Sequence, residues 1–127
     1  MRINHIAMMV KNSEKSADFY KKNFGFNEVK RFTKPGWDGY AIILQLNDVQ
    51  LEIIQFQNPI DKKEDLSNPN FIGLKHIGLQ VDNVNDTFKD LKKKGVDIDK
   101  PIKGTTCAWI CFLRDPDGIN IELYQSN

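Results

Sequence analysis

The chain of 127 residues contains an internal repeat, which restricts the possible folds more than any other feature of the sequence. The segment HIAMMVKNSEKSADFY, which starts at His5, aligns with HIGLQVDNVNDTFKDL, which starts at His76. Further along, Leu51-Glu52-Ile53 aligns with Ile121-Glu122-Leu123. The offsets of the two alignments differ by one residue, and a single gap within the first helix reconciles them. A repeat of this length predicts two copies of one supersecondary unit.

Each half has the pattern of one strand, one helix and three further strands. Alternating apolar residues predict the strands, and apolar residues at helical spacing predict the helices. We expect Ser13 to cap the first helix and either Asn83 or Asn85 to cap the second. Gly25 and Gly95 are expected to end these helices. The predicted strands lie near residues 3–10, 27–33, 40–46, 50–57, 75–81, 97–98, 108–114 and 120–124, and the predicted helices end at residues 24 and 94.

This order predicts an α+β fold made of two tandem βαβββ modules within a single domain, residues 1–127. Module 1 is expected to span residues 1–57, and module 2 is expected to span residues 74–127. The segment between them, residues 58–73, is rich in Asn, Asp, Pro and Lys, so we expect it to be a linker.

Composition and charge exclude several classes of function. Apolar residues make up 40% of the chain and charged residues 28%, as in ordinary globular proteins. A net charge of +1 gives no electrostatic basis for binding nucleic acid or an anionic membrane, and no apolar run approaches the length of a membrane span. In a regular strand the Cα atoms of Cys107 and Cys111 would lie about 13 Å apart, too far for a disulfide. We therefore expect a cytoplasmic protein with reduced cysteines.

Strand parity places both histidines of the chain at matched positions with two glutamates. In the first strand Ile6 and Met8 belong to the apolar face that should meet the helix, so His5 points to the opposite face. The same alternation puts the second histidine, and one glutamate from the last strand of each half, on the helix-free face. These four residues are His5, Glu52, His76 and Glu122.

A carboxylate on the solvent face of an antiparallel strand is common and by itself indicates no function. Packing, however, does not require a His–Glu pair on this face in both copies. Two imidazoles and two carboxylates suit a borderline divalent ion such as Zn, Ni, Co, Fe or Mn. We therefore predict one divalent metal ion bound by His5, Glu52, His76 and Glu122, with one of the carboxylates also able to act as a general base.

These features resemble the vicinal oxygen chelate superfamily over nearly the whole chain. The resemblance rests on the duplicated βαβββ pattern, the two strand-borne histidines and the DPDG-x-x-IE motif that ends at Glu122. Within the superfamily the chain is most similar to the glyoxalase I (lactoylglutathione lyase) enzymes, whose four metal ligands correspond to His5, Glu52, His76 and Glu122. The segment Lys103-Gly104-Thr105-Thr106 also resembles a glyoxalase loop. The resemblance implies that the modules form a cupped mixed sheet.

The resemblance also implies an activity. Glyoxalase I isomerises the hemithioacetal of a 2-oxoaldehyde and a thiol to a 2-hydroxyacyl thioester, by way of a metal-bound enediolate, in methylglyoxal detoxification. Glu122 or Glu52 would remove the C1 proton. In glyoxalase I the site lies at a dimer interface, whereas in other members both modules of one chain close over it. We expect a homodimer, and the resemblance leaves open which chains supply the ligands.

Two positions differ from the glyoxalase I pattern, so the identity of the thiol is open. Met9 replaces an arginine, and Phe56 replaces an asparagine, that in glyoxalase I help to hold the glutamyl group of glutathione. Replacement charge could come from Arg31, Lys34, Lys103 or Arg114, although a solvated surface is the simpler interpretation. Aromatic residues that could line a pocket, or simply pack in the core, are Trp37, Tyr40, Trp109 and Tyr124.

Other members of the superfamily provide alternatives. An extradiol-type dioxygenase would use His5, His76 and Glu122, but Glu52 would then take a coordination position that catechol and O₂ need. A methylmalonyl-CoA epimerase usually has Gln at the position of Glu52, and a fosfomycin thiol transferase usually has Thr at the position of Ala7. A bleomycin-resistance-type binding protein is the non-catalytic alternative, and such proteins generally lack the four ligands.

Overall fold

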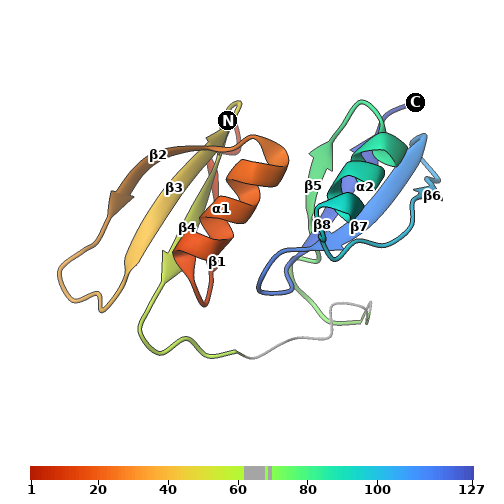
Figure 1. The fold of residues 1–127 in the computed structure, drawn as a ribbon. Coiled ribbons are helices and arrows are strands. Elements are labelled where there is room, and N and C mark those ends of the chain that lie inside the picture. Colours follow the sequence, from red (N-terminus) through yellow and green to blue (C-terminus); the bar gives the residue numbers. More distant parts are fainter. Residues whose placement is uncertain (62–67, 69) are drawn as a thin grey trace. The chain divides into compact units, whose positions relative to one another are not determined.

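The chain forms two compact units, Met1–Lys62 and Lys63–Asn127, in a computed structural model that describes residues 1–61, 68 and 70–127. Each unit contains one helix and one four-stranded mixed sheet, so the predicted α+β fold with the order βαβββ in each half is confirmed (Figure 1). Part of the linker expected at 58–73, residues 62–67 and 69, lies outside the described residues. The first unit contains β1 (His5–Met9), α1 (Ser13–Phe24), β2 (Asn27–Phe32), β3 (Tyr40–Leu46) and β4 (Val49–Gln55). The second contains β5 (Ile77–Gln80), α2 (Val84–Lys93), β6 (Ile102–Lys103), β7 (Trp109–Arg114) and β8 (Asn120–Gln125).

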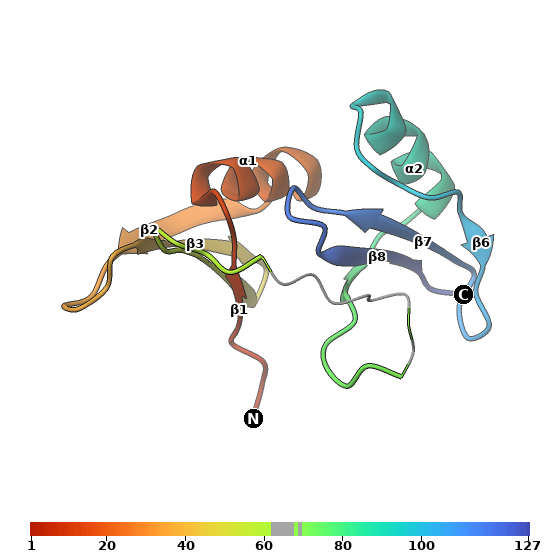
Figure 2. The same ribbon diagram turned by 90° about the horizontal axis from the view of Figure 1, so that it is seen from below.

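The two sheets have the same topology. Their strand orders are β1-β4-β3-β2 and β5-β8-β7-β6. The first strand of each unit pairs in parallel with the last, and all other neighbours are antiparallel. Each helix lies along one face of its own sheet (Figure 2). In each sheet the first strand therefore lies beside the last strand. The first strand begins at or directly after a histidine of the predicted ligand set, and the last strand contains a glutamate of that set.

The core of each unit lies between its helix and its sheet. In the first unit the Tyr20 hydroxyl of α1 lies 3.8 Å from the Sδ atom of Met8 in β1, which identifies the helix-facing side of that strand. The buried apolar side chains of the first unit include Ala17, Tyr20, Ile42, Leu44, Leu51 and Ile53, and those of the second include Val84, Leu91, Leu113, Ile121 and Leu123. In β4 and β8 the residues between these are more exposed, so the predicted two-residue alternation is confirmed for these strands, whereas residues 41–44 of β3 are all buried.

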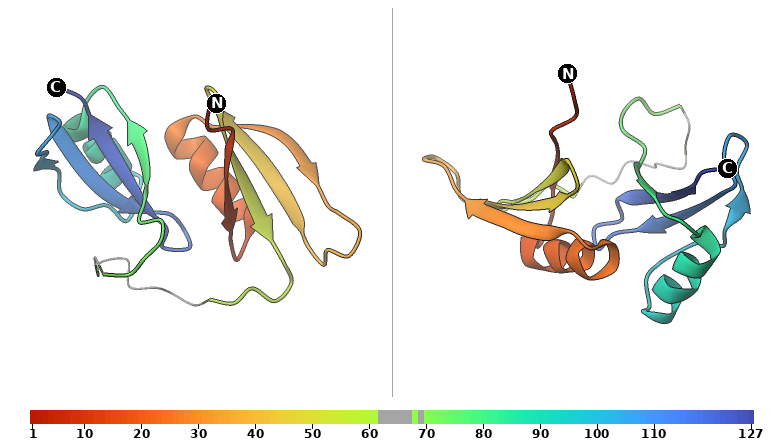
Figure 3. Two further views of the ribbon diagram at one scale, coloured as in Figure 1. Left: turned by 180° about the vertical axis from the view of Figure 1, so that it is seen from behind. Right: turned by 90° about the horizontal axis from the view of Figure 1, so that it is seen from above.

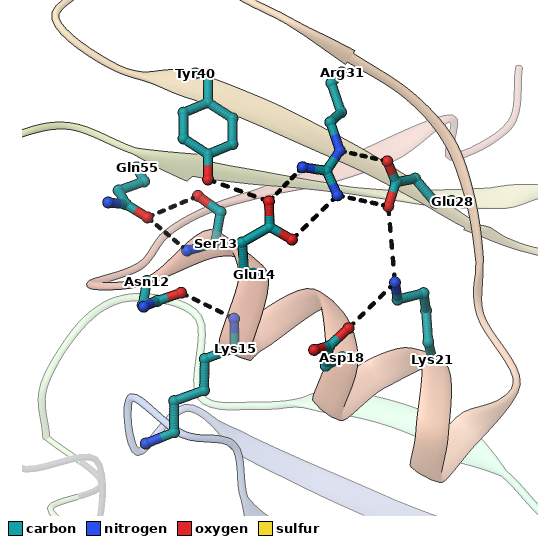
Figure 4. A network of polar contacts seen from close by, with 10 residues as sticks. All are labelled: Asn12, Ser13, Glu14, Lys15, Asp18, Lys21, Glu28, Arg31, Tyr40 and Gln55. Atoms are coloured by element: carbon teal, nitrogen blue, oxygen red, sulfur yellow. Dashed lines mark hydrogen bonds and ion pairs between the residues drawn. The ribbon is translucent and has the colours of Figure 1, made fainter.

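The start of α1 is held by two side-chain caps (Figure 4). The Asn12 carboxamide accepts a hydrogen bond from the Lys15 amide at 2.9 Å, and the extended conformation of Asn12 makes it the N-cap. The Oε1 atom of Gln55 accepts from the amide of Ser13 at 2.7 Å and from its hydroxyl at 3.1 Å. The expectation that Ser13 caps the helix is therefore wrong by one residue, because Ser13 is buried as the first helical residue and is itself bound by Gln55.

The start of α2 repeats this arrangement. The Asn83 carboxamide accepts from the Asp86 amide at 2.9 Å, so Asn83 is the cap of the two candidates. The Oε1 atom of Gln125 accepts from the Val84 amide at 2.9 Å. In each unit a glutamine at the end of the last strand thus binds the start of the helix. This glutamine and the ligand-type glutamate lie on opposite faces of the strand. Neither of the two helices in the described part of the chain is long and apolar enough to cross a membrane.

One predicted strand is displaced. Residues 97–98 contribute only an isolated bridge between Ile98 and Leu113, and the edge strand β6 forms later, at Ile102–Lys103. Pro101 lies between the two pairings and has no N–H to donate to a ladder, which accounts for the interruption.

Gly39, just before β3, is expected to tolerate no side chain. A Cβ atom at this position would lie 1.8 Å from the carbonyl oxygen of Gln55 and 2.9 Å from the Cα atom of Phe56, and these backbone atoms cannot move without distorting the end of β4. Gly39→Ala should therefore lower the free energy of unfolding by about 1–3 kcal/mol, the range for overpacking. Urea denaturation measures this change. Gly78→Ala is the control, because nothing lies within 4 Å of the added methyl group; equal stability of the two variants would refute the close approach.

Candidate metal centre

In the first unit the structure brings His5 and Glu52 together on the helix-free face. His5 begins β1, which runs beside β4 (Figure 3), and the register pairs Ala7 of β1 with Glu52 of β4. The Nε2 atom of His5 lies 3.7 Å from Oε2 of Glu52. The carboxylate is largely covered, with 17% of its side chain exposed, whereas the imidazole is 51% exposed. A shielded carboxylate beside an accessible imidazole is half of the predicted ligand set.

In the second unit His76 and Glu122 form the matching pair. His76 directly precedes β5, and Glu122 lies in β8 opposite Gly78. The Nε2 atom of His76 lies 2.7 Å from Oε2 of Glu122, and this carboxylate is again 17% exposed. Phe112, opposite Glu122 on β7, contacts the imidazole edge to face with ring centroids 5.5 Å apart. The second pair is therefore tighter than the first and has an aromatic neighbour.

The chemistry and spacing of each pair fit a divalent metal ion. Metal bonds to imidazole nitrogen and carboxylate oxygen are about 2.0–2.2 Å long, so two ligands at right angles on one ion lie about 3 Å apart. The two N–O distances, 3.7 and 2.7 Å, lie on either side of this value. Each pair consists of neutral-nitrogen and anionic-oxygen donors that borderline divalent ions accept.

The structure does not gather all four predicted ligands into one cluster. Among the residues that it describes, no group of three or more His, Cys, Asp and Glu side chains is arranged to hold a metal ion. The reason is that the pairs belong to different compact units, and each unit supplies one imidazole and one carboxylate. Each His–Glu pair is therefore a half-site, and a single four-ligand centre would require the two half-sites to combine.

Both arginines considered for substrate binding are already bound to carboxylates. Arg31 contacts Glu14 and Glu28, and its guanidinium hydrogen bonds hold the pKa of Glu28 below its usual value (Figure 4). Arg114 binds Asp97 and Asp99 at 2.7–3.1 Å. Hydrogen bonds from Arg114 likewise lower the pKa values of both aspartates. These networks brace the units and leave neither arginine as a spare cation for substrate.

An aromatic cluster occupies the region where the glyoxalase I pattern has polar residues. Phe56, directly after β4, packs edge to face against Trp37 with centroids 5.2 Å apart. Trp37 also contacts Phe32 at 5.9 Å, and the Lys34 ammonium lies 4.8 Å from the Trp37 ring. Met9 is 52% exposed. This part of the first unit thus offers apolar and aromatic surface with one lysine beside it.

Several residues next to the two pairs are absent from the sequence-based prediction. Asn4 Oδ1 lies 2.9 Å from Nδ1 of His5, and Phe112 contacts His76. Strand alternation in β7 would have placed Phe112 on the face of Glu122, but only with the pairing register known. The capping glutamines had a clearer signal, because Gln55 and Gln125 are aligned by the same offset as Glu52 and Glu122.

The chain has a duplicated βαβββ fold with one His–Glu pair per module, and comparison with known proteins identifies the family. The family model for the glyoxalase/bleomycin resistance protein/dioxygenase superfamily matches residues 2–123. The chain therefore belongs to this superfamily, as the sequence resemblance predicted.

Individual relatives agree with this assignment. The chain is similar to lactoylglutathione lyase of Neisseria meningitidis, with 30% identity over 131 residues that cover 98% of this chain and 91% of that protein. It is also similar to human mitochondrial methylmalonyl-CoA epimerase, with 28% identity over 135 residues that cover 98% of this chain and 74% of that protein. A crystal structure of a glyoxalase family protein from Enterococcus faecalis superposes with a TM-score of 0.81 at 25% identity, covering 98% of this chain and 97% of that one.

Proposed function

We propose that the chain is a glyoxalase I-like metalloenzyme that isomerises the hemithioacetal of a 2-oxoaldehyde and a thiol to a 2-hydroxyacyl thioester. The observation that supports this most strongly is the occurrence of one His–Glu pair at the same position on the helix-free face of each unit. The similarity to a lactoylglutathione lyase over nearly the full length of both proteins supports the same reaction class.

The proposed metal centre combines both pairs, with His5, Glu52, His76 and Glu122 as ligands of one divalent ion (Ni, Zn, Co, Fe or Mn). When bound, such an ion supplies positive charge beside the two neighbouring oxygens of the substrate, which acidifies the carbon-bound proton. Four protein ligands would leave coordination positions of such an ion open for substrate oxygens.

The proton transfer is assigned to a glutamate. Glu122, or Glu52 in its place, takes the proton from C1, which leaves an enediolate, and returns a proton to C2. The hydroxyl proton on the C1 oxygen moves to the C2 oxygen, so the substrate and the thioester are isomers and no oxidant or reductant is needed. Both carboxylates are shielded from water, which favours proton transfer to a substrate rather than to solvent.

The thiol is proposed to be one with apolar or aromatic character rather than one held by its glutamyl group. The positions that would contact a glutamyl group hold Met9 and Phe56, and Phe56 is packed against Trp37. Arg31 and Arg114 do not supply a replacement, because each is bound by two carboxylates.

A panel of reconstituted enzymes tests the reaction. Protein stripped of metal and reloaded with Ni, Zn or Co is mixed with methylglyoxal and either glutathione or a less polar thiol, and thioester formation is followed by ultraviolet absorbance. We expect turnover that requires metal, disappears with a chelator and is faster with the less polar thiol. Absence of thioester from every thiol and metal combination, with metal shown to be bound, would refute the isomerase proposal.

Epimerisation of an acyl thioester is the second candidate function. The similarity to a methylmalonyl-CoA epimerase supports it, and it requires the same removal of a proton next to a carbonyl. Incubation with methylmalonyl-CoA in deuterated water distinguishes the two: deuterium incorporation at C2, together with no thioester from methylglyoxal adducts, would favour the epimerase.

The assembly and compartment are also proposals. We propose that the two modules act as one domain and that the protein is a homodimer, because the helix-free faces and edge strands of such sheets need to be covered. Cytoplasmic location suits the cysteines, since Cys107 and Cys111 are both free thiols and burial raises the pKa of Cys111 to about 11.

A further inference from the structure

We infer that Asn4 is a positioning residue that selects the tautomer of His5 and so presents its Nε2 atom to the metal ion. This inference rests on the metal centre proposed above. It adds a residue that lies outside the four-ligand set and that directly contacts one of the ligands.

The geometry at His5 assigns different partners to its two ring nitrogens. The Nδ1 atom lies 2.9 Å from the carboxamide oxygen of Asn4. The Nε2 atom is the one that faces Glu52, at 3.7 Å. This second distance exceeds that of a hydrogen bond, so the carboxylate does not accept a hydrogen bond from Nε2.

Asn4 is held in place by its own backbone. Its carbonyl oxygen accepts a hydrogen bond from the amide of Gln50 at 2.9 Å, which extends the pairing of β1 with β4 by one residue. The carboxamide therefore projects from an anchored residue at the start of the strand. Substitution of the side chain leaves this backbone hydrogen bond intact, which makes the side-chain function separable from folding.

The chemical consequence follows from the neutral imidazole, which has one N–H and one lone pair. When Nδ1–H donates to Asn4, the lone pair is on Nε2, the atom that a metal ion needs. Ligand histidines commonly donate their other N–H to an acceptor of this kind, and loss of the acceptor typically weakens metal binding about 10–100-fold.

The second unit orients its histidine by different means. The residue before His76 is Lys75, whose ammonium donates to the carbonyl of Asn68 and cannot accept from an imidazole. His76 instead has its Nε2 atom 2.7 Å from Oε2 of Glu122 and its ring packed against Phe112. The position in the first unit that corresponds to Phe112, opposite Glu52, is Ile43. Its aliphatic side chain provides no aromatic ring for His5. The two half-sites thus hold their histidines differently, and Asn4 belongs to the first alone.

Two variants at this position test the inference. Asn4→Leu has nearly the same size and no acceptor, whereas Asn4→Asp retains an acceptor oxygen. In metal-free protein at a pH where imidazoles are neutral, ¹⁵N–¹H correlation spectra report the tautomer of each histidine, and the chain has only two. Cobalt titration measures metal affinity independently of any enzymatic activity, so the inference can fail while the isomerase proposal stands, or the reverse.

We expect the Nδ1–H tautomer for His5 in the wild-type protein and in Asn4→Asp, and a shift towards the Nε2–H tautomer in Asn4→Leu, with His76 unchanged in all three. Cobalt affinity should fall about 10–100-fold in Asn4→Leu and much less in Asn4→Asp. An unaltered His5 tautomer in Asn4→Leu, or cobalt affinity within about twofold of wild type, would overturn the inference. Equal changes at both histidines would show a general disturbance of the fold and would overturn it as well.

Discussion

Glu122→Gln should reduce isomerase turnover by about 10²–10⁴-fold, the usual cost of losing a general base, and weaker metal binding should add to this loss. The substitution preserves the size of the side chain and one possible oxygen ligand, but it removes the basic carboxylate. Steady-state rates with the enzyme saturated in metal separate the proton-transfer defect from the binding defect, and calorimetric metal titration measures the latter.

The stability of this variant should change little. Glu122 lies on the helix-free face of β8, and its neighbours in the strand, Ile121 and Leu123, are the residues that enter the core. The carboxylate pairs with the side chain of His76 at 2.7 Å and takes no part in the backbone ladder, so replacing it by an amide leaves the hydrogen bonds of the sheet intact. A large fall in the melting temperature would therefore point to a structural function for this carboxylate.

Asn120→Ala is the matched control. Asn120 lies two residues earlier on the same face of β8 and pairs with Arg114 across the strands. It should leave metal content nearly unchanged. Glu122→Gln protein with full metal loading and wild-type turnover would show that Glu122 is an ordinary residue on the solvent-facing side of a strand.

His5→Ala and His76→Ala should each lower the affinity for the same metal ion by more than about 100-fold, because direct ligands contribute more than the residues that support them. If each pair bound its own metal ion, each substitution would weaken binding at one pair and leave the affinity of the other pair unaffected. Gln80→Ala, an exposed residue of β5 on the face of His76, is the control and should bind metal normally. Equilibrium titration with cobalt, followed by its visible absorption, measures the metal affinity of the wild-type protein and of the three variants.

Mixing the two histidine variants shows which chains build the site. If module 1 of one chain combines with module 2 of another, mixed dimers regain one intact site, and after subunit exchange about a quarter of all sites should recover. If both modules of one chain form the site, mixing restores nothing. Recovery would support the homodimer directly, whereas a mass of one chain in light scattering would contradict it.

Much of the fold could be predicted because the same βαβββ pattern occurs in both halves of the sequence. The bounds of β3, Tyr40–Leu46, follow directly from a run of strand-forming residues between turns. The faces of His5 and Glu122 follow from strand alternation, which depends only on local sequence. Pro101, by contrast, interrupts an edge pairing that local propensity alone would have continued, and so the short edge strand forms five residues later than the sequence pattern predicts.

The site could be predicted as a set of residues but not as a geometry. Alternation states which face a side chain occupies, and it cannot give the difference between 3.7 Å at His5 and 2.7 Å at His76. Those distances depend on the register between strands that are far apart in the chain. The contact of Phe112 with His76 depends on it too. The contact of Asn4 joins neighbouring residues and depends instead on side-chain conformation, which the sequence pattern does not give.

The number of metal ions bound per chain tests most directly whether the two His–Glu pairs form one centre. Metal-free protein of known concentration is saturated with zinc, freed of excess ion by gel filtration and measured by elemental analysis. The proposed centre, in which His5, Glu52, His76 and Glu122 share one ion, predicts one zinc per chain. Two zinc ions per chain would show that each pair binds its own ion, and no bound zinc, with the same result when nickel or cobalt replaces zinc in the experiment, would show that the pairs do not form a metal centre.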